Sequence, residues 1–147
     1  MHTYSMAGHV IRRLHQISTH EFTKQMQQAG FDLTPVQFAA LDAIIQTPGI
    51  DQARVAAAIA YDRATIGGVI DRLEQKGFVT RKISRRDRRA RVVEVTEKGA
   101  GVYVASLPVI TALQENILPG LTPEERATFL QLGRKAVNIA TDTKTDI

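Results

Sequence analysis

Hydrophobic residues recur every three or four positions along most of the chain, which is the spacing of one buried face on an α-helix. This pattern, with the capping residues and breaks between its stretches, predicts helices over residues 5–28, 35–46, 51–60, 62–76, 96–117 and 122–141. The spacing changes in two short runs rich in β-branched residues, 78–83 and 92–96, which predict strands. We therefore expect a mainly α fold with a small β-hairpin, or wing.

The central part of this pattern is typical of a winged helix-turn-helix. Two short helices, 51–60 and 62–76, are separated by a tight break at Tyr61 and Asp62, and Gly77 suits the end of the second helix. Asp62 is expected to cap that helix. A strand, a basic loop and a second strand follow directly, as they do in a wing. The second helix is therefore the expected recognition helix.

The outer helices carry more hydrophobic positions than a small winged domain needs. We expect a winged helix-turn-helix part at residues 34–97 and dimerisation helices at residues 5–30 and 98–141, which would bury one another in a homodimer. Two recognition helices would then lie about one DNA turn, roughly 34 Å, apart. The matching site is a pseudo-palindromic operator in double-stranded DNA.

Positive charge is concentrated in and behind the recognition helix. Between Arg63 and Arg91 the chain has ten Lys or Arg and three acidic residues, a net charge of +7, whereas the whole chain carries +4 and the remainder therefore −3. A basic stripe on a mildly acidic body is the footprint expected of nucleic-acid binding. A solvated charged loop is the alternative, which the position of the arginines between two strands disfavours.

Composition narrows the function classes. Because the chain has no cysteine, disulfides, thiolate nucleophiles and thiolate zinc sites are excluded. No apolar run reaches the roughly 18 residues needed to cross a bilayer, so we expect a cytoplasmic protein without a membrane partner. No Ser/His/Asp grouping, phosphate loop or metal-binding helix motif indicates an enzyme or a cofactor. A winged-helix module that binds protein or RNA stays as an alternative to a DNA-binding regulator.

Two stretches resemble the MarR family of bacterial transcriptional regulators. The first lies within residues 62–79 and contains DRATI and VIDRLEQKGFV; the second, residues 87–99, is DRRARVVEVTEKG and is similar to the family's wing signature. The resemblance covers nearly the whole chain. It implies a single MarR-type domain over residues 1–147 and a repressor, the family's usual behaviour, although the residues themselves do not distinguish repressor from activator. Residues 8–14 and 31–41 also resemble members that control catabolism of nicotinate-type aromatic acids.

The recognition helix is expected to insert its N-terminal half into the major groove. Arg63 and Thr65 would face base edges there, whereas Arg72 and Lys76 would lie near phosphates or solvent. The full set of expected DNA contacts is Arg63, Ala64, Thr65, Gly67, Gly68, Arg72, Arg85, Arg86, Asp87, Arg88, Arg89 and Arg91.

The wing is expected to contact the minor groove. An arginine at its tip suits a narrow minor groove, where the negative potential is enhanced. The resemblance implies this role for Arg89, with Asp87 folding back to orient arginines through a charge-assisted bond. The other cations of the hairpin, Arg81 and Lys82 among them, would contact phosphates and make binding depend on salt.

Gly67 and Gly68 stand where the family often has a Ser or Thr and an Arg. Two glycines inside a helix cost about 1 kcal/mol each relative to Ala. Either they let the backbone approach DNA closely, or they reflect tight packing or a tolerated loss. The sequence favours neither interpretation.

All four histidines lie in the first twenty residues, and His9, Arg12 and His15 fall along one flank of the first helix. The resemblance implies an effector pocket walled partly by the first two helices. A small aromatic carboxylate, such as a nicotinate-type compound, suits the cluster because arginine can grip the carboxylate and histidine can bond a ring substituent. The expected ligand-binding residues are His9, Arg12, Arg13, His15 and Phe38. Ordinary polar surface and a zinc-responsive site are the alternatives, although the histidines lack i, i+4 spacing.

Overall fold

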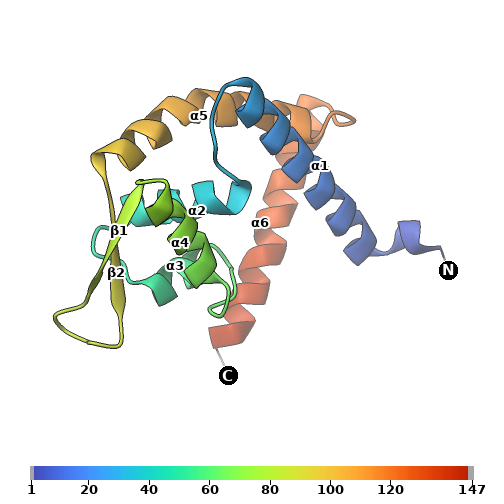
Figure 1. Ribbon diagram of the computed structural model, residues 1–147. Coiled ribbons are helices and arrows are strands. Elements are labelled where there is room, and N and C mark those ends of the chain that lie inside the picture. Colours follow the sequence, from blue (N-terminus) through green and yellow to red (C-terminus); the bar gives the residue numbers. More distant parts are fainter. Residues whose placement is uncertain (1, 146–147) are drawn as a thin grey trace.

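A computed structural model describes residues 2–145, with side chains described from residue 2 to residue 138. The elements are η1 (Thr3–Ser5), α1 (Ala7–Gln28), α2 (Pro35–Gln46), α3 (Gln52–Ala58), α4 (Ile66–Gln75), β1 (Val79–Ile83), β2 (Arg91–Val95), α5 (Glu97–Ile117) and α6 (Pro123–Thr145). The two strands pair antiparallel, with Val79 opposite Val95 and Ile83 opposite Arg91. In Figure 1, α1 and α5 lie above the winged part, which comprises α2, α3, α4 and the hairpin, and α6 descends beside it.

The structure confirms the predicted fold class, mainly helical with a β-wing, and side-chain caps fix where several helices begin. Thr34 and Gln37 form a capping box at α2, in which each side chain accepts from the other's backbone N–H at 3.2 Å. The Asp51 carboxylate accepts from the backbone N–H of Arg54 at 2.9 Å and opens α3. These local signals are legible in the sequence, which is why the element order could be predicted.

One hydrophobic core runs through the winged part and continues between α1 and α5. The recognition helix α4 contributes Ile66, Ile70 and Leu73, each at most 1% exposed. The other buried hydrophobic residues are Phe22, Met26, Leu33, Ala40, Leu41, Ile44, Ile50, Val55, Ala56, Phe78, Val79, Val93, Ile110 and Leu113. The recognition helix therefore has one face fixed in the core and the opposite face free.

A contact between α2 and α5 joins the winged part to the helices above it. The rings of Phe38 and Tyr103 stack with centroids 5.5 Å apart, and the Tyr103 hydroxyl donates to the Asp42 carboxylate at 2.6 Å. The hydrogen bond to Asp42 raises the pKa of Tyr103 above its ordinary value, and burial adds to the increase. Phe38 thus packs within the molecule.

The recognition helix ends in a tight turn. Gly77 has a φ of 79°, which only glycine adopts without strain. The N–H of Gly77 donates to the Glu74 carbonyl at 2.9 Å, and the N–H of Phe78 donates to the Leu73 carbonyl at 2.9 Å. This pair of bonds is a Schellman motif, which satisfies carbonyls that the end of a helix would otherwise leave unpaired.

The start of α5 is built onto that same turn. Thr96 caps α5 by accepting from the N–H of Gly99 at 3.0 Å, and its hydroxyl donates to the Gly77 carbonyl at 2.6 Å. The N–H of Thr96 donates to the Phe78 carbonyl at 2.9 Å. A Cβ on Gly99 would lie 2.1 Å from the Phe78 carbonyl oxygen, so no other residue fits there without displacement. The Thr-x-x-Gly pattern in the sequence is the signature of this packing.

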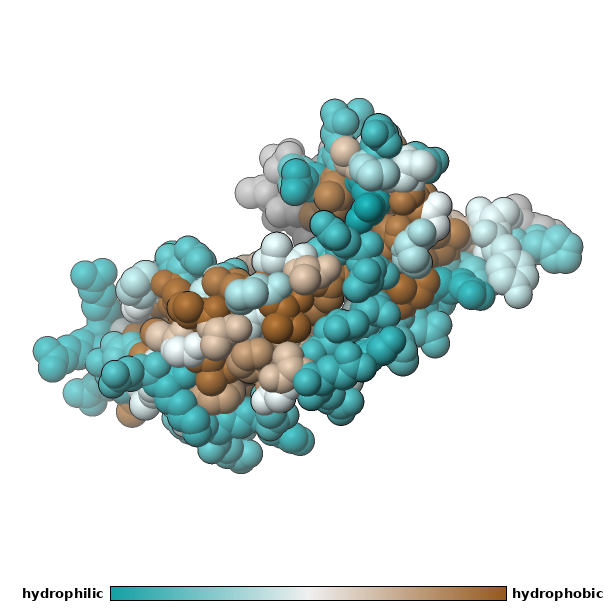
Figure 2. Space-filling model, turned by 90° about the horizontal axis from the view of Figure 1, so that it is seen from above, coloured by the Kyte–Doolittle hydropathy of each residue, from teal (hydrophilic) through white to brown (hydrophobic). Residues whose placement is uncertain are grey.

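Hydrophobic side chains remain exposed on the outer helices. Those at least 38% exposed on α1 and α6 include Val10, Ile11, Ile17, Phe129, Leu130 and Leu132. Figure 2 looks down on α5 and α1 and shows hydrophobic residues in brown across this face. No side chain of α6 is buried among those described, and this helix runs to Thr145, beyond the end predicted at residue 141. Of the described helices, none is long and apolar enough to cross a membrane.

We predict that Gly99→Ala destabilises the fold by about 3 kcal/mol, because an added methyl group would overlap the Phe78 carbonyl. Gly101→Ala is the matched control, since a Cβ there meets nothing within 4 Å and alanine favours the helix by about 1 kcal/mol. Urea unfolding of both variants measures the difference. Equal stabilities for the two variants would contradict the close packing of Gly99.

Candidate nucleic-acid interface

Residues 62–65, which were predicted to form the first turn of the recognition helix, form a separate turn that precedes it. α3 ends at Ala58 instead of residue 60, and Ala60 follows it at a φ of 54°. α4 begins at Ile66 instead of residue 62 as predicted. The Asp62 carboxylate accepts from the N–H of Ala64 at 2.9 Å, so it stabilises the turn and does not cap α4. Arg63, Ala64 and Thr65 are exposed on this turn.

The outward face of α4 contains few side chains near its start. Gly68 lies opposite the buried stripe, and a Cβ there would meet nothing within 4 Å. A Cβ on Gly67 would lie 3.4 Å from Nε2 of Gln52, which is ordinary contact. Tight packing within the protein therefore does not explain Gly68, while Arg72 is exposed further along the helix.

The loop of the wing is organised by two short side chains. The Ser84 hydroxyl accepts from the N–H groups of Arg86 and Asp87 at 3.2 and 3.3 Å. The Asp87 carboxylate accepts from the backbone N–H of Arg89 at 2.9 Å. Asp87 therefore orients Arg89 through the backbone and not through a guanidinium, which corrects the expected geometry. Its charge-assisted bond still fixes the turn from which the Arg89 side chain projects.

A groove of about 580 Å³ brings the turn, α3 and the wing together. Four of the expected residues line it, namely Arg63, Asp87, Arg89 and Arg91. Arg54 and Gln52 line it as well, and the sequence reasoning missed both. The available signal was the Asp51 cap, which puts both residues in the first turn of α3, the helix that packs against α4.

Two cations that were predicted to meet phosphates or solvent, Arg81 and Lys76, are held by other parts of the protein. Arg81 bonds the carboxylates of Asp71 and Glu74 on α4, and its guanidinium donates to Oε1 of Gln52 at 3.3 Å. Lys82 pairs with Glu94 at 2.8 Å across the hairpin but stays 65% exposed, so its expected phosphate contact remains a prediction. Lys76 is bound by the segment between α1 and α2. The expectations for Arg81 and Lys76 were wrong, because the partners of these two cations lie on other parts of the chain.

Arg81 neutralises acidic residues on the recognition helix. Burial alone would lower the pKa of the Arg81 guanidinium, but the hydrogen bonds to Glu74 and Asp71 more than reverse this, so its pKa is raised. The side chain of Arg81 is 15% exposed, whereas those of Asp71 and Glu74 are 53% and 42% exposed. The pairing removes negative charge from a surface that is otherwise cationic.

The remaining arginines of the basic stripe are exposed. Within the described residues, their side chains make no ion pair and no guanidinium hydrogen bond: Arg63, Arg72, Arg85, Arg86, Arg88, Arg89 and Arg91. They belong to the turn before α4, to α4 itself and to the wing. A surface of this kind attracts polyanions, and its free guanidinium groups can bond phosphates and base edges.

The second predicted site is a hollow along α1, with a volume of about 730 Å³. His9, Arg12, Arg13 and His15 all line it, and His20 joins them. Phe38 does not belong to this hollow, because its ring packs against Tyr103 and Phe22 in the interior. The structure thus places the expected polar residues together and the expected aromatic wall elsewhere.

His9 is the most constrained residue of the α1 hollow. Its ring meets the Tyr4 ring edge-on, with centroids 5.2 Å apart. Its Nε2 atom is buried and has no hydrogen-bond partner in the described part of the chain. A buried polar atom without a partner is unfavourable, and a bound ligand can satisfy it. Among the described residues, no three His, Cys, Asp or Glu side chains gather as a metal site would require.

Comparison with known proteins identifies similar chains. The sequence profile of the MarR family matches residues 31–90. The chain is 35% identical to the transcriptional regulator HosA of Escherichia coli O127:H6, over 90% of this chain and 95% of HosA. It is 34% identical to the transcriptional repressor NicR of Pseudomonas putida, over 89% of this chain and 82% of NicR.

A solved structure is similar over nearly the same length. It is the structure of BpsR from Bordetella bronchiseptica, a protein whose DNA binding is regulated by 6-hydroxynicotinic acid. The TM-score is 0.83 at 28% identity, and the match covers 93% of this chain and 96% of BpsR.

We predict that Arg81→Met destabilises the fold by about 2 kcal/mol, since it leaves Asp71 and Glu74 without their cation and removes the bond to Gln52. Arg85→Met on the exposed wing removes the same charge and should change stability by less than about 0.5 kcal/mol. The midpoint of urea unfolding tests the pair. A similar loss in both variants would mean that Arg81 is no more important to the fold than a free surface arginine.

Proposed function

Since this chain belongs to the MarR family of transcriptional regulators, we propose that it is a homodimeric repressor that binds a pseudo-palindromic operator and is released from it by a small aromatic carboxylate. The observation that carries the DNA-binding part is the set of exposed arginines on the turn, α4 and the wing, together with Arg54 beside the same groove. Among the described residues these arginine side chains have no acidic partner, so they are available to phosphates of a duplex that α4 would contact.

In the proposed complex, α4 enters the major groove with Gly68 and Arg72 on its outward face. Arg63 and Thr65 approach base edges from the turn, and because Gly68 has no side chain, the helix backbone can come close to the DNA. Arg89 projects from the turn fixed by Asp87 and enters the flanking minor groove. Arg85, Arg86, Arg88 and Arg91 contact phosphates.

The homodimer is supported by the hydrophobic side chains that the outer helices leave uncovered. Leu130 and Leu132 on α6 are 50% and 59% exposed, and Ile11 on α1 is 65% exposed. A second copy that covers these faces would remove them from water, at about 25 cal/mol per Å² of apolar surface. It would also place two copies of α4 for one operator.

The proposed effector site is the α1 hollow. The hollow is open and lined by α1 alone, and it combines Arg12 and Arg13 with His9. A carboxylate can accept bonds from an arginine fork, and a ring hydroxyl or nitrogen can pair with the unpartnered Nε2 of His9. The similar protein BpsR is regulated by 6-hydroxynicotinic acid, which is an acid of this class. Ligand would favour a dimer whose recognition helices are wrongly spaced for the operator.

We predict that Arg89→Ala weakens binding to the operator by about tenfold or more, because a minor-groove contact is lost while the fold is kept. The operator is the duplex that the wild-type protein selects from random sequence. Arg134→Ala on α6 is the matched control, since it removes the same charge from an exposed position away from the wing. Fluorescence anisotropy measures affinity, and sedimentation checks the dimer. An Arg89→Ala variant that binds as tightly as the control would contradict the assigned role.

We predict that 6-hydroxynicotinate or a related aromatic acid raises the melting temperature and releases the operator, and that Arg12→Ala combined with Arg13→Ala removes both effects. A ligand at 100 times its dissociation constant stabilises the folded state by about 2.7 kcal/mol. Arg134→Ala again controls for the loss of positive charge. If nicotinate, 6-hydroxynicotinate and benzoate all leave the melting temperature unchanged, the effector proposal is wrong, while the DNA-binding proposal is judged separately on the operator.

A further inference from the structure

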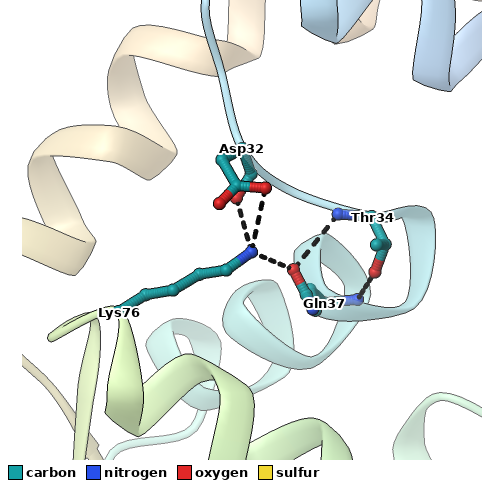
Figure 3. A network of polar contacts seen from close by, with 4 residues as sticks. All are labelled: Asp32, Thr34, Gln37 and Lys76. Carbon is teal, nitrogen blue, oxygen red and sulfur yellow. Dashed lines mark hydrogen bonds and ion pairs between the residues drawn. The ribbon is translucent and has the colours of Figure 1, made fainter.

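Lys76 stands apart from the exposed cations of the basic stripe. It is the C-cap of α4, and the Schellman bonds of the next two residues fix its backbone. Its side chain is 21% exposed and extends to the segment between α1 and α2 (Figure 3). The ammonium nitrogen lies 2.8 Å from the Asp32 carbonyl oxygen, 2.8 Å from Oε1 of Gln37 and 3.3 Å from the Asp32 carboxylate. Three oxygen atoms therefore meet the three N–H donors of the ammonium group.

The Gln37 oxygen that binds Lys76 also belongs to the capping box of α2. It accepts from the backbone N–H of Thr34 at 3.2 Å, so one oxygen atom serves both the start of α2 and the end of α4 (Figure 3). Gln37 is only 7% exposed, and an oxygen that lost its cation there would be poorly compensated by water. The network is thus sensitive to the removal of the ammonium group.

This network fixes the end of the recognition helix that is distant from its predicted DNA-reading end. The helix has only ten residues, and Arg81 holds its middle through Asp71 and Glu74. A change of direction at Lys76 would move Gly68 and the preceding turn against the DNA. Displacements of about 1 Å can disrupt recognition that depends on aligned hydrogen bonds.

We propose that Lys76 is a positioning residue for operator recognition: it sets the direction of α4 by binding Asp32 and Gln37, and it does not contact DNA. The proposal rests on the proposed function, because it needs α4 to read the operator. It also accounts for a lysine in the basic stripe whose donors are all used inside the protein.

A positioning role and a phosphate contact have different signatures. Loss of a phosphate contact weakens binding to all sequences and reduces the salt slope, the change in log affinity with log salt concentration, by about 0.9. Loss of alignment weakens operator binding and leaves non-specific binding and the salt slope unchanged, because the exposed arginines remain. A purely structural role changes stability and leaves operator affinity unchanged at temperatures where the variant is folded.

The experiment compares Lys76→Met with Lys24→Met, which removes the same charge from an exposed lysine of α1 that makes no hydrogen bond or ion pair among the described residues. Affinities for the selected operator duplex and for a scrambled duplex are measured at several salt concentrations, below the melting temperature of each variant. We expect Lys76→Met to bind the operator about tenfold more weakly, with unchanged scrambled-duplex affinity and salt slope. Lys24→Met should match the wild type in all three.

Two further variants complete the design. Lys76→Arg can donate to the same oxygen atoms, so it should recover most of the operator affinity. Lys76→Gln keeps one N–H donor group and replaces Lys76→Met if the methionine variant does not fold. Its operator affinity should fall with no change in salt slope.

Three results would overturn the proposal: operator affinity equal to that of the wild type in folded Lys76→Met or Lys76→Gln, an equal loss on both duplexes with a smaller salt slope, or no recovery by Lys76→Arg. A failure of the proposed function would be seen separately, because the wild-type protein would then select no duplex at all.

Discussion

The close contact between Gly99 and the Phe78 carbonyl is the constraint on which the arrangement of the functional parts depends. Four elements meet there, because α4 ends, β1 begins, β2 ends and α5 begins within a few residues of it. Thr96 binds both carbonyls of the turn, and the missing Cβ of Gly99 lets the helix lie against that backbone. The wing, the recognition helix and α5 therefore all extend from this one contact. Close backbone packing at the contact sets their directions relative to one another.

Much of the fold could be predicted because its signals are local. The capping box of Thr34, the carboxylate of Asp51 and the glycine at position 77 each act within four residues, so the sequence displays them next to the element that they start or end. The resemblance to the MarR family added the wing signature. The Thr96 and Gly99 pattern was visible too, although its purpose was not, since the carbonyl that demands Gly99 belongs to another part of the chain.

The errors for Lys76 and Arg81 have a common physical cause. Lys76 bonds residues that are 44 and 39 positions away, and Arg81 bonds Gln52 at a separation of 29, so their sequence neighbours do not reveal that they are occupied. Asp62 has the residue type of a helix cap and forms a turn instead, because both structures offer an N–H to the same carboxylate. Phe38 was placed in the ligand site because the resemblance implies that the second helix walls the pocket, and the sequence does not show that Tyr103 covers its ring.

The open space at Gly68 affects how the sequence of this protein can evolve. It lies on the outward face of α4, and apart from the adjoining helix backbone no described atom lies within 4 Å of the place where a side chain would begin. In the proposed complex, a substitution there would put a new group between helix and DNA with no need to repack the core. Any residue other than proline would also favour the helix more than glycine does. Under the proposed function, the position can therefore acquire a different operator preference in one mutational step, so that the target sequence can diverge while the fold stays the same.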